Sequence, residues 1–220
     1  MLVCVATAEQ FARRRVEAAK RLENDGNPMS VEFCAGIAPV ADRYDVFLVD
    51  QWGVLHDGRM PYAGAVDCLR RLVEAGKTVV LISNSGRRAA ESEERLHRLG
   101  ISAACYSHLV TSGEIAWQML AAGEGFCRTL TGKRCALFAS DAVSRFADGL
   151  PVTLATLDTA DFILLSGMDD SRPTVDYERM IEAGNRRGLP LVCANPDLAR
   201  ITPDGLKPGA GAIAARYAAR

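Results

Sequence analysis

The stretch YDVFLVDQWGVLHDG, residues 44–58, decides the fold that we expect for this chain. Its apolar run, residues 46–49, has the length and composition of a buried strand and ends abruptly on the carboxylate of Asp50. Gly53 follows three residues later, and the pair Asp57-Gly58 then gives the signal of a tight hairpin turn. The stretch therefore predicts a buried strand that ends on an acid, followed by a turn and a hairpin.

The alternation of strand and helix continues away from this stretch. Apolar residues at helical spacing after Pro61 predict a helix that ends at Gly76, and TVVLIS, residues 78–83, is typical of a second buried strand. The cycle restarts near residue 125, where CALFA, DFILL and LPLVCA predict further strands with helices between them. Alternating elements of this kind indicate an α/β protein with parallel sheets and helices on their faces.

Composition and charge exclude several classes of protein. Apolar residues make up 49% of the 220, charged residues make up 24%, and 26 Lys and Arg balance 27 Asp and Glu. A net charge of -1 gives no electrostatic reason to expect nucleic acid or an anionic membrane as a partner, and no apolar run approaches the length of a membrane span. Seven scattered cysteines without a Cys-x-x-Cys pair favour reduced thiols, so we expect a cytoplasmic protein.

Two polar residues end the first two predicted strands. Ligands of parallel α/β sheets bind beyond the carboxyl ends of the strands, so Asp50 and Ser83 should lie side by side at that edge. Asp50 could attack phosphorus there, while the Ser83 hydroxyl and loop N–H groups hold the phosphoryl oxygens. The spacing alone fits equally well with Asp50 capping a turn and Ser83 being an ordinary loop residue.

Four blocks of sequence follow the order and spacing of the haloacid dehalogenase superfamily. They are DVFLVDQWGVLHDG, VVLISNSGRR, FILLSGMDDSRPTVDYERM and LVCANPDLARITPDGLKPGAGAIAA. They most resemble the subclass with a large α/β cap, which includes nitrophenyl-phosphatase and pyridoxal-phosphate phosphatase relatives, and ordered blocks are more specific than any single motif. The resemblance implies a Rossmann-like core at residues 29–125 with an α/β cap at 126–220, and leaves 1–28 as an N-terminal extension.

The resemblance also assigns roles to individual residues. It implies that Asp50 is the nucleophile and a magnesium ligand, that the backbone carbonyl of Trp52 is a second ligand, and that Ser83 contacts the transferred phosphoryl group. Asn84 would help to hold the substrate. Segments of the cap that face the substrate cleft would contribute Asp169 and the run Asn195-Pro196-Asp197.

The chain departs from the family at Trp52. Phosphatases of the family carry a second aspartate at this position, which protonates the leaving oxygen and later activates water. Such acid–base help is typically worth about 10²- to 10⁴-fold in rate. Dehalogenases of the superfamily have an aromatic residue there, since a departing halide needs no proton, so hydrolysis of a carbon–halogen bond is an alternative.

A second departure concerns the far end of the sequence. In the family the cap is followed by a return to the core that carries a lysine and further metal carboxylates, whereas this sequence ends at Arg220. We therefore expect an incomplete core. The expected function is hydrolysis of a small phosphate ester with Mg²⁺, and the competing hypothesis is an inactive or truncated relative that binds a phosphorylated ligand. Caps of this kind often pair, which suggests a homodimer through the cap.

Overall fold

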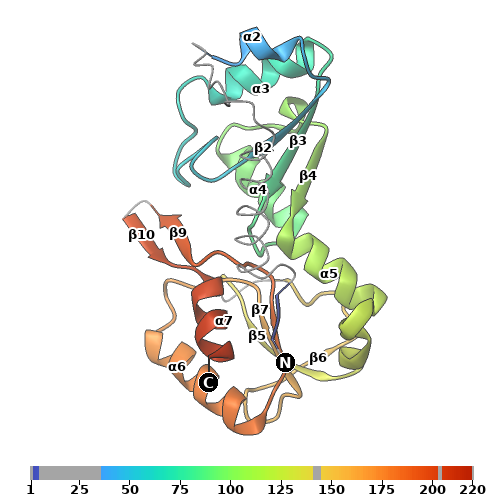
Figure 1. Cartoon of the computed structure of the whole chain (residues 1–220), viewed down its shortest axis with the longest axis vertical. Helices are drawn as coiled ribbons and strands as arrows, with labels where there is room; N and C mark the ends of the chain where they lie inside the picture. Colours follow the sequence, from blue (N-terminus) through green and yellow to red (C-terminus); the bar gives the residue numbers. More distant parts are fainter. Residues whose placement is uncertain (1, 5–35, 141–144, 203–204, 220) are drawn as a thin grey trace, which may run out of the picture.

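The computed structural model describes residues 2–4, 36–140, 145–202 and 205–219. The chain forms two α/β units that follow one another along the long axis of the molecule (Figure 1). Each unit is built on a parallel sheet, which confirms the predicted fold class. Within the described residues, no helix has both the length and the hydrophobicity needed to cross a membrane.

The first unit, residues 36–111, contains a three-stranded parallel sheet in the order β2-β3-β4. Its strands are β2 (Val46–Asp50), β3 (Thr78–Ser83) and β4 (His108–Thr111). Its helices are α2 (Ala38–Ala41), α3 (Ala65–Glu74), α4 (Ala89–Arg98) and the short 3₁₀ helix η1 (Ala103–Cys105).

Among the described residues, helices cover one face of this sheet and none covers the other. Leu69 and Leu72 of α3 and Leu96 of α4 pack on Val79 and Leu81 of β3 and form the core of the unit. Side chains alternate between the two faces of a strand, so the residues between these core positions point the other way. That opposite face exposes apolar side chains from all three strands, namely Val46, Leu48, Ile82 and Val110.

The predicted hairpin after β2 forms only in part. A turn lies at Asp57-Gly58 as predicted, but a single antiparallel bridge, between His56 and Pro61, follows it in place of two paired strands. The Asp57 carboxylate accepts hydrogen bonds from the N–H groups of residues 59 and 60, at 2.8 and 2.9 Å, and so caps the turn. The segment folds back on the end of β2, where the N–H of Leu55 donates to the carbonyl of Gln51 at 2.8 Å. What forms is a compact flap, residues 51–61, with only isolated bridges.

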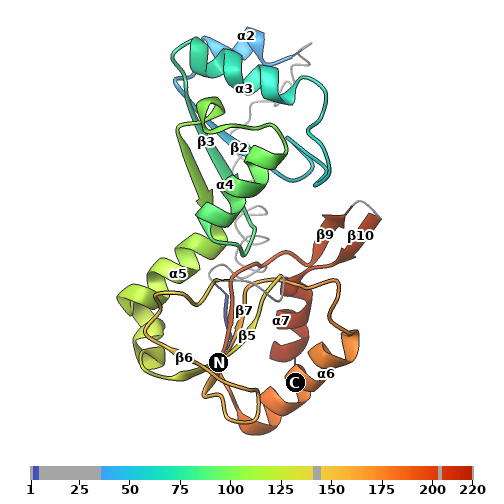
Figure 2. The same cartoon turned by 180° about the vertical axis from the view of Figure 1, so that it is seen from behind.

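The second unit, residues 112–219 together with 2–4, has a five-stranded parallel sheet in the order β1-β8-β7-β5-β6. A separate antiparallel pair, β9 and β10, extends from the second unit on the side where the flap of the first unit lies (Figures 1 and 2). The strands are β1 (Leu2–Cys4), β5 (Arg134–Phe138), β6 (Thr153–Leu154), β7 (Phe162–Leu165), β8 (Leu191–Cys193), β9 (Ala199–Thr202) and β10 (Gly205–Pro208). The helices are α5 (Ser112–Ala122), η2 (Gly125–Leu130), α6 (Thr174–Arg187) and α7 (Ala210–Ala218).

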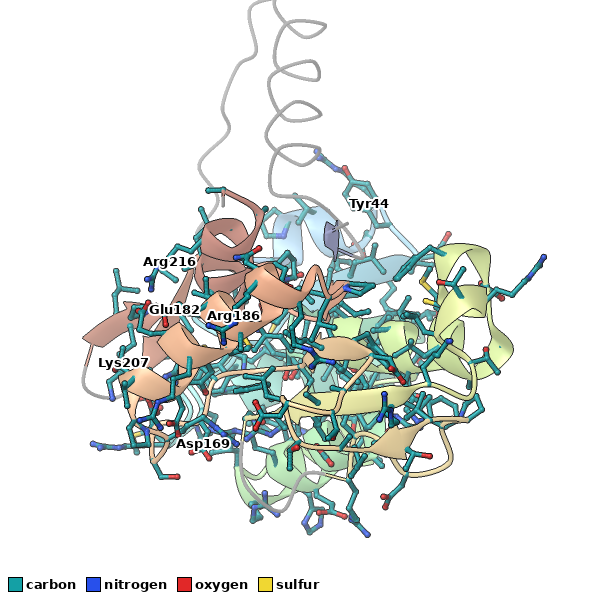
Figure 3. All side chains as sticks on the ribbon, turned by 90° about the horizontal axis from the view of Figure 1, so that it is seen from below. Tyr44, Asp169, Glu182, Arg186, Lys207 and Arg216 are labelled. Carbon is teal, nitrogen blue, oxygen red and sulfur yellow. The ribbon has the colours of Figure 1, made fainter. Side chains whose placement is uncertain are left out.

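Helices cover both faces of this second sheet. Tyr177 of α6 and Tyr217 of α7 pack on one face, and Ala116 and Leu120 of α5 pack on the other. The four residues of β7 are buried as a result. Charged side chains stay on the outer side of α6 and α7, where Figure 3 labels Glu182, Arg186 and Arg216.

Two predicted boundaries can be set against this arrangement. The packing of α5 leads us to count it with the second unit, although the boundary was predicted at residue 125. Residues 2–4, inside the predicted extension 1–28, form the edge strand β1 beside β8. The remainder of that extension lies outside the described residues, and the domain limits themselves stay predictions.

An ion pair ties the two units together where α4 and α5 begin. The Arg88 guanidinium donates to both Glu114 oxygens, at 2.7 and 3.2 Å, and lies over the Trp117 ring at 3.8 Å from its centre. The Glu114 carboxylate also accepts from the N–H of Ala89. The hydrogen bond from Arg88 is the main reason that the pKa of Glu114 is lowered.

The closest approach of the two units is between backbones. A Cβ added to Gly86 would lie 1.5 Å from the carbonyl oxygen of Ser166, and a Cβ added to Gly113 would lie 2.3 Å from the carbonyl oxygen of Gly86. Only a residue without a side chain fits this position. Gly86 thus allows the loop after β3 to touch the loop after β7.

We predict that Gly86→Ala lowers the free energy of unfolding by about 1–3 kcal/mol, because the added methyl group forces the two loops apart. Urea unfolding measures this change. Gly36→Ala is the matched control, since a Cβ at Gly36 meets nothing within 4 Å. Equal stability of the two variants would contradict the close approach.

We predict that Glu114→Gln weakens the acid sensitivity of the fold. The pKa of Glu114 is lowered in the folded state, so its ion pair stabilises the protein above the unfolded pKa of about 4.3 and this stability is lost as the pH falls through the folded value. The free energy of unfolding should therefore drop less between pH 6 and pH 3 in the variant. Glu124→Gln, an exposed change just beyond α5, should keep the full drop; identical pH profiles for Glu114→Gln and the unaltered protein would count against the pair.

Candidate active site

The ends of β2 and β3 place the two predicted strand-end residues together. In the parallel register Asp50 lies opposite Ile82, so Ser83 follows directly beside it. Both line a pocket of about 380 Å³. The Asp50 carboxylate accepts a hydrogen bond from the N–H of Gln51 at 2.8 Å, and the Ser83 hydroxyl accepts one from the N–H of Ser85 at 3.1 Å. The turn that follows each strand thus orients its polar side chain.

The opposite wall of the pocket comes from the second unit. Ser140, Ser166 and Asn195 follow β5, β7 and β8, and all three line the same pocket as Asp50. The carboxyl ends of two parallel sheets therefore face each other across one space. Parallel α/β sheets bind ligands at this edge, and here both sheets contribute it to the same pocket.

The run Asn195-Pro196-Asp197 is held rigidly in this wall. The Asn195 side chain accepts a hydrogen bond from the N–H of Asp197 at 2.9 Å, which makes a tight side-chain-capped turn. The start of α7 packs against the run, and the N–H of Gly211 donates to the carbonyl of Asp197 at 3.0 Å. A Cβ at Gly211 would lie 2.1 Å from the carbonyl oxygen of Pro196, which explains the glycine.

The predicted substrate-binding residues do not all lie where they were expected. Asn84 lines the pocket, and its amide donates to the Asp197 carboxylate across it at 3.0 Å. Asp169 is not among the residues that line the pocket, because its carboxylate turns back to accept from the N–H and hydroxyl of Ser171. The neighbouring residue, Asp170, lines the pocket instead.

Three arginines line the pocket together with three aspartates. Arg87, Arg95 and Arg200 face Asp50, Asp170 and Asp197. Arg200 is bound to Asp170, with one contact at 3.1 Å, and this hydrogen bond is the main reason that the pKa of Asp170 is lowered. The sequence had named Asp50 and Asp197 in this set, but nothing in its pattern marked Arg95 or Arg200 as pocket residues.

Trp52 belongs to the pocket wall and is firmly packed. Arg95 lies over its ring at 4.8 Å from the centre, and the His56 ring meets it edge-on at 4.9 Å. Arg95 also donates to the carbonyl of Gly58 at 3.1 Å, which fixes the flap over α4. Burial lowers the pKa values of both His56 and Arg95, so the imidazole beside Trp52 is neutral at pH 7.

The oxygen donors of the pocket suit a hard cation. Among the described residues, no cluster of three or more His, Cys, Asp or Glu side chains is placed to hold a metal ion. Asp50 and Trp52, the two predicted ligands, both line the pocket. Mg²⁺ is commonly held by one or two carboxylates, waters and the phosphate of a substrate, so these donors fit it.

The chain is similar in sequence to a 4-nitrophenylphosphatase and to chronophin. It is 35% identical to a 4-nitrophenylphosphatase from Schizosaccharomyces pombe over 63 residues, which are 28% of this chain and 21% of the relative. It is 36% identical to chronophin from Bos taurus over 87 residues, which are 39% of this chain and 29% of the relative. The matched segments thus span less than a third of either relative.

Solved structures are similar in fold over more than four fifths of this chain. A haloacid dehalogenase-like hydrolase from Brucella suis has a TM-score of 0.72 and 29% identity, over 86% of this chain and 70% of that one. A glycerol phosphate phosphatase from Mycobacterium tuberculosis, in complex with magnesium, has a TM-score of 0.60 and 26% identity, over 82% of this chain and 53% of that one.

The structure is that of a parallel α/β protein in which a pocket lies between two units, with an aspartate at the end of a strand in that pocket. Residues 47–151 match the family of haloacid dehalogenase-like hydrolases. Together with the relatives above, this match confirms the predicted resemblance to the haloacid dehalogenase superfamily and to its nitrophenyl-phosphatase subclass.

Proposed function

We propose that this protein hydrolyses a small phosphorylated metabolite through a phosphoryl intermediate on Asp50. One observation carries the proposal: Asp50 and Ser83 lie side by side at the carboxyl end of a parallel sheet. Both line a pocket of about 380 Å³ that arginines also line. The phosphatases among the relatives support the same reaction class. A cytoplasmic location and a homodimer through the second unit belong to the proposal as well.

The first step is nucleophilic attack. An oxygen of the Asp50 carboxylate attacks phosphorus, the bond from phosphorus to the leaving oxygen breaks, and an acyl phosphate forms on Asp50. In the second step water attacks that phosphorus, the bond to Asp50 breaks, and inorganic phosphate leaves. Both steps pass through a trigonal-bipyramidal arrangement whose three equatorial oxygens carry negative charge.

The pocket supplies groups that stabilise this charge. The Ser83 hydroxyl and the N–H groups of the loop after β3 would donate to the phosphoryl oxygens. Arg87 and Arg95 add positive charge on the same side of the pocket. Asp50 and the carbonyl of Trp52 would hold Mg²⁺, which, when bound, offsets the negative charge of the phosphoryl group.

A specific observation favours the alternative of binding without turnover. Trp52 occupies the position from which relatives donate a proton, and its indole cannot act as an acid. Under this alternative the pocket binds a phosphate ester without cleaving it. A dehalogenase would also dispense with that proton, and its activity should release halide without added metal.

We predict that the unaltered protein hydrolyses 4-nitrophenyl phosphate in the presence of Mg²⁺ and that Asp50→Asn lowers kcat by at least about 10³-fold, because the amide is not a nucleophile. Release of 4-nitrophenolate is the measurement. Asp45→Asn is the matched control, since Asp45 adjoins the opposite end of β2 and its carboxylate is fully exposed.

The outcomes separate the three functions. Full activity of Asp50→Asn would rule out the proposed mechanism. A ligand-induced rise in Tm without turnover would favour the binding protein, and metal-independent halide release from a haloacid would favour the dehalogenase.

A further inference from the structure

The proposed reaction needs a general acid and base, and the residues assigned so far do not include one. When the ester bond breaks, the leaving oxygen needs a proton, and the later attack by water needs a base. Trp52 can do neither. A substitute must be a titratable side chain that lines the pocket opposite Asp50.

The three carboxylates of the pocket have different surroundings. Asp50 is the nucleophile and must be ionised. Asp170 is held by Arg200 and lies 3.6 Å from the ammonium group of Lys207, so it stays a carboxylate with no proton to give. Asp197 is the remaining acid among the residues that line the pocket.

Asp197 has the position and freedom that a proton donor needs. Its backbone is fixed by the turn with Asn195 and by the contact with Gly211, so the side chain projects from a rigid point. One carboxyl oxygen accepts the hydrogen bond from Asn84 at 3.0 Å, and no described residue donates to the other. That second oxygen can carry a proton while the first keeps its bond to Asn84.

The surroundings of Asp197 favour its protonated form. The residue is partly buried and no arginine or lysine pairs with it among the contacts described above. Burial is the main reason that the pKa of Asp197 is raised, and it outweighs the hydrogen bond from Asn84, which lowers that pKa. A carboxyl group with a raised pKa next to an ionised one is the usual division of labour between a general acid and a nucleophile.

We propose that Asp197, contributed by the second unit, is the general acid and base of the reaction in place of residue 52. This role rests on the proposed function. As Asp50 attacks phosphorus, the Asp197 carboxyl gives its proton to the departing oxygen, and the free alcohol leaves. Asp197, now a carboxylate, takes a proton from water as that water attacks the acyl phosphate; the Asp50–phosphorus bond breaks, phosphate leaves, and both carboxyl groups return to their starting states.

This assignment has a structural consequence. Asp50 and Asp197 belong to different units, so the two catalytic carboxylates share a pocket only while the units are closed on each other. The contact between Gly86 and Ser166 holds that closed arrangement. The acid–base function would then depend on closure, whereas the nucleophile would not.

The test compares Asp197→Asn with the unaltered protein on three esters: phenyl, 4-nitrophenyl and 2,4-dinitrophenyl phosphate. Asparagine keeps the oxygen that accepts from Asn84 and removes only the proton. The value of kcat/KM reports transfer to Asp50, so it should fall about 10²- to 10⁴-fold on phenyl phosphate and progressively less as the leaving group becomes more acidic. On the dinitrophenyl ester the variant should release a burst of one equivalent and then turn over slowly, because water lacks its base.

The controls make each result decisive. Asp158→Asn, an exposed aspartate outside the pocket, should behave as the unaltered protein. An equal loss of kcat/KM on all three esters, with no burst, would overturn the role of Asp197 and leave the proposed function standing. No turnover of any ester by the unaltered protein would overturn the proposed function and this role together. If Asp197→Asn does not fold, Asp197→Ser, whose hydroxyl can still accept from Asn84, goes through the same series.

Discussion

The contact between Gly86 and the carbonyl oxygen of Ser166 is the constraint on which the site depends. The two sheets run toward each other, and their carboxyl ends share a pocket only because two loops can approach until backbone meets backbone. A side chain at Gly86 would hold these loops apart. The pocket is polar because a side chain that can hydrogen-bond ends β2 and β3 and closely follows β5, β7 and β8.

Much of this arrangement could be predicted from the sequence. The runs 46–49 and 78–83 form neighbouring strands, although β2 is only partly buried and not fully buried as predicted. Parallel pairing brings their ends together, so the adjacency of Asp50 and Ser83 followed from local pattern. The blocks shared with the family added Asn84 and Asn195. These residues share one property: each lies at the end of a strand, where its position depends mainly on the strand itself.

Other features depend on long-range contacts, and the sequence could not reveal them. Asp170 faces the pocket and Asp169 does not because Arg200, thirty residues away, binds one of two adjacent carboxylates. Arg95 reaches the pocket by lying over Trp52, and a helical pattern places it on α4 without saying what it meets. The predicted hairpin is reduced to one antiparallel bridge because the Asp57 carboxylate, and not a partner strand, accepts the hydrogen bonds from the N–H groups of Arg59 and Met60.

The bare side of the first sheet bears on how firmly the nucleophile is held. Within the described residues β2 pairs with β3 alone, and its outward face, including Leu48 at 66% exposure, has no helix over it. An edge strand with solvent on one face opens more readily than a central strand. Its amide hydrogens should therefore exchange before those of β3. Asp50, the proposed nucleophile, thus ends an edge strand of the sheet that the described residues form, and one ladder of hydrogen bonds to β3 fixes its position.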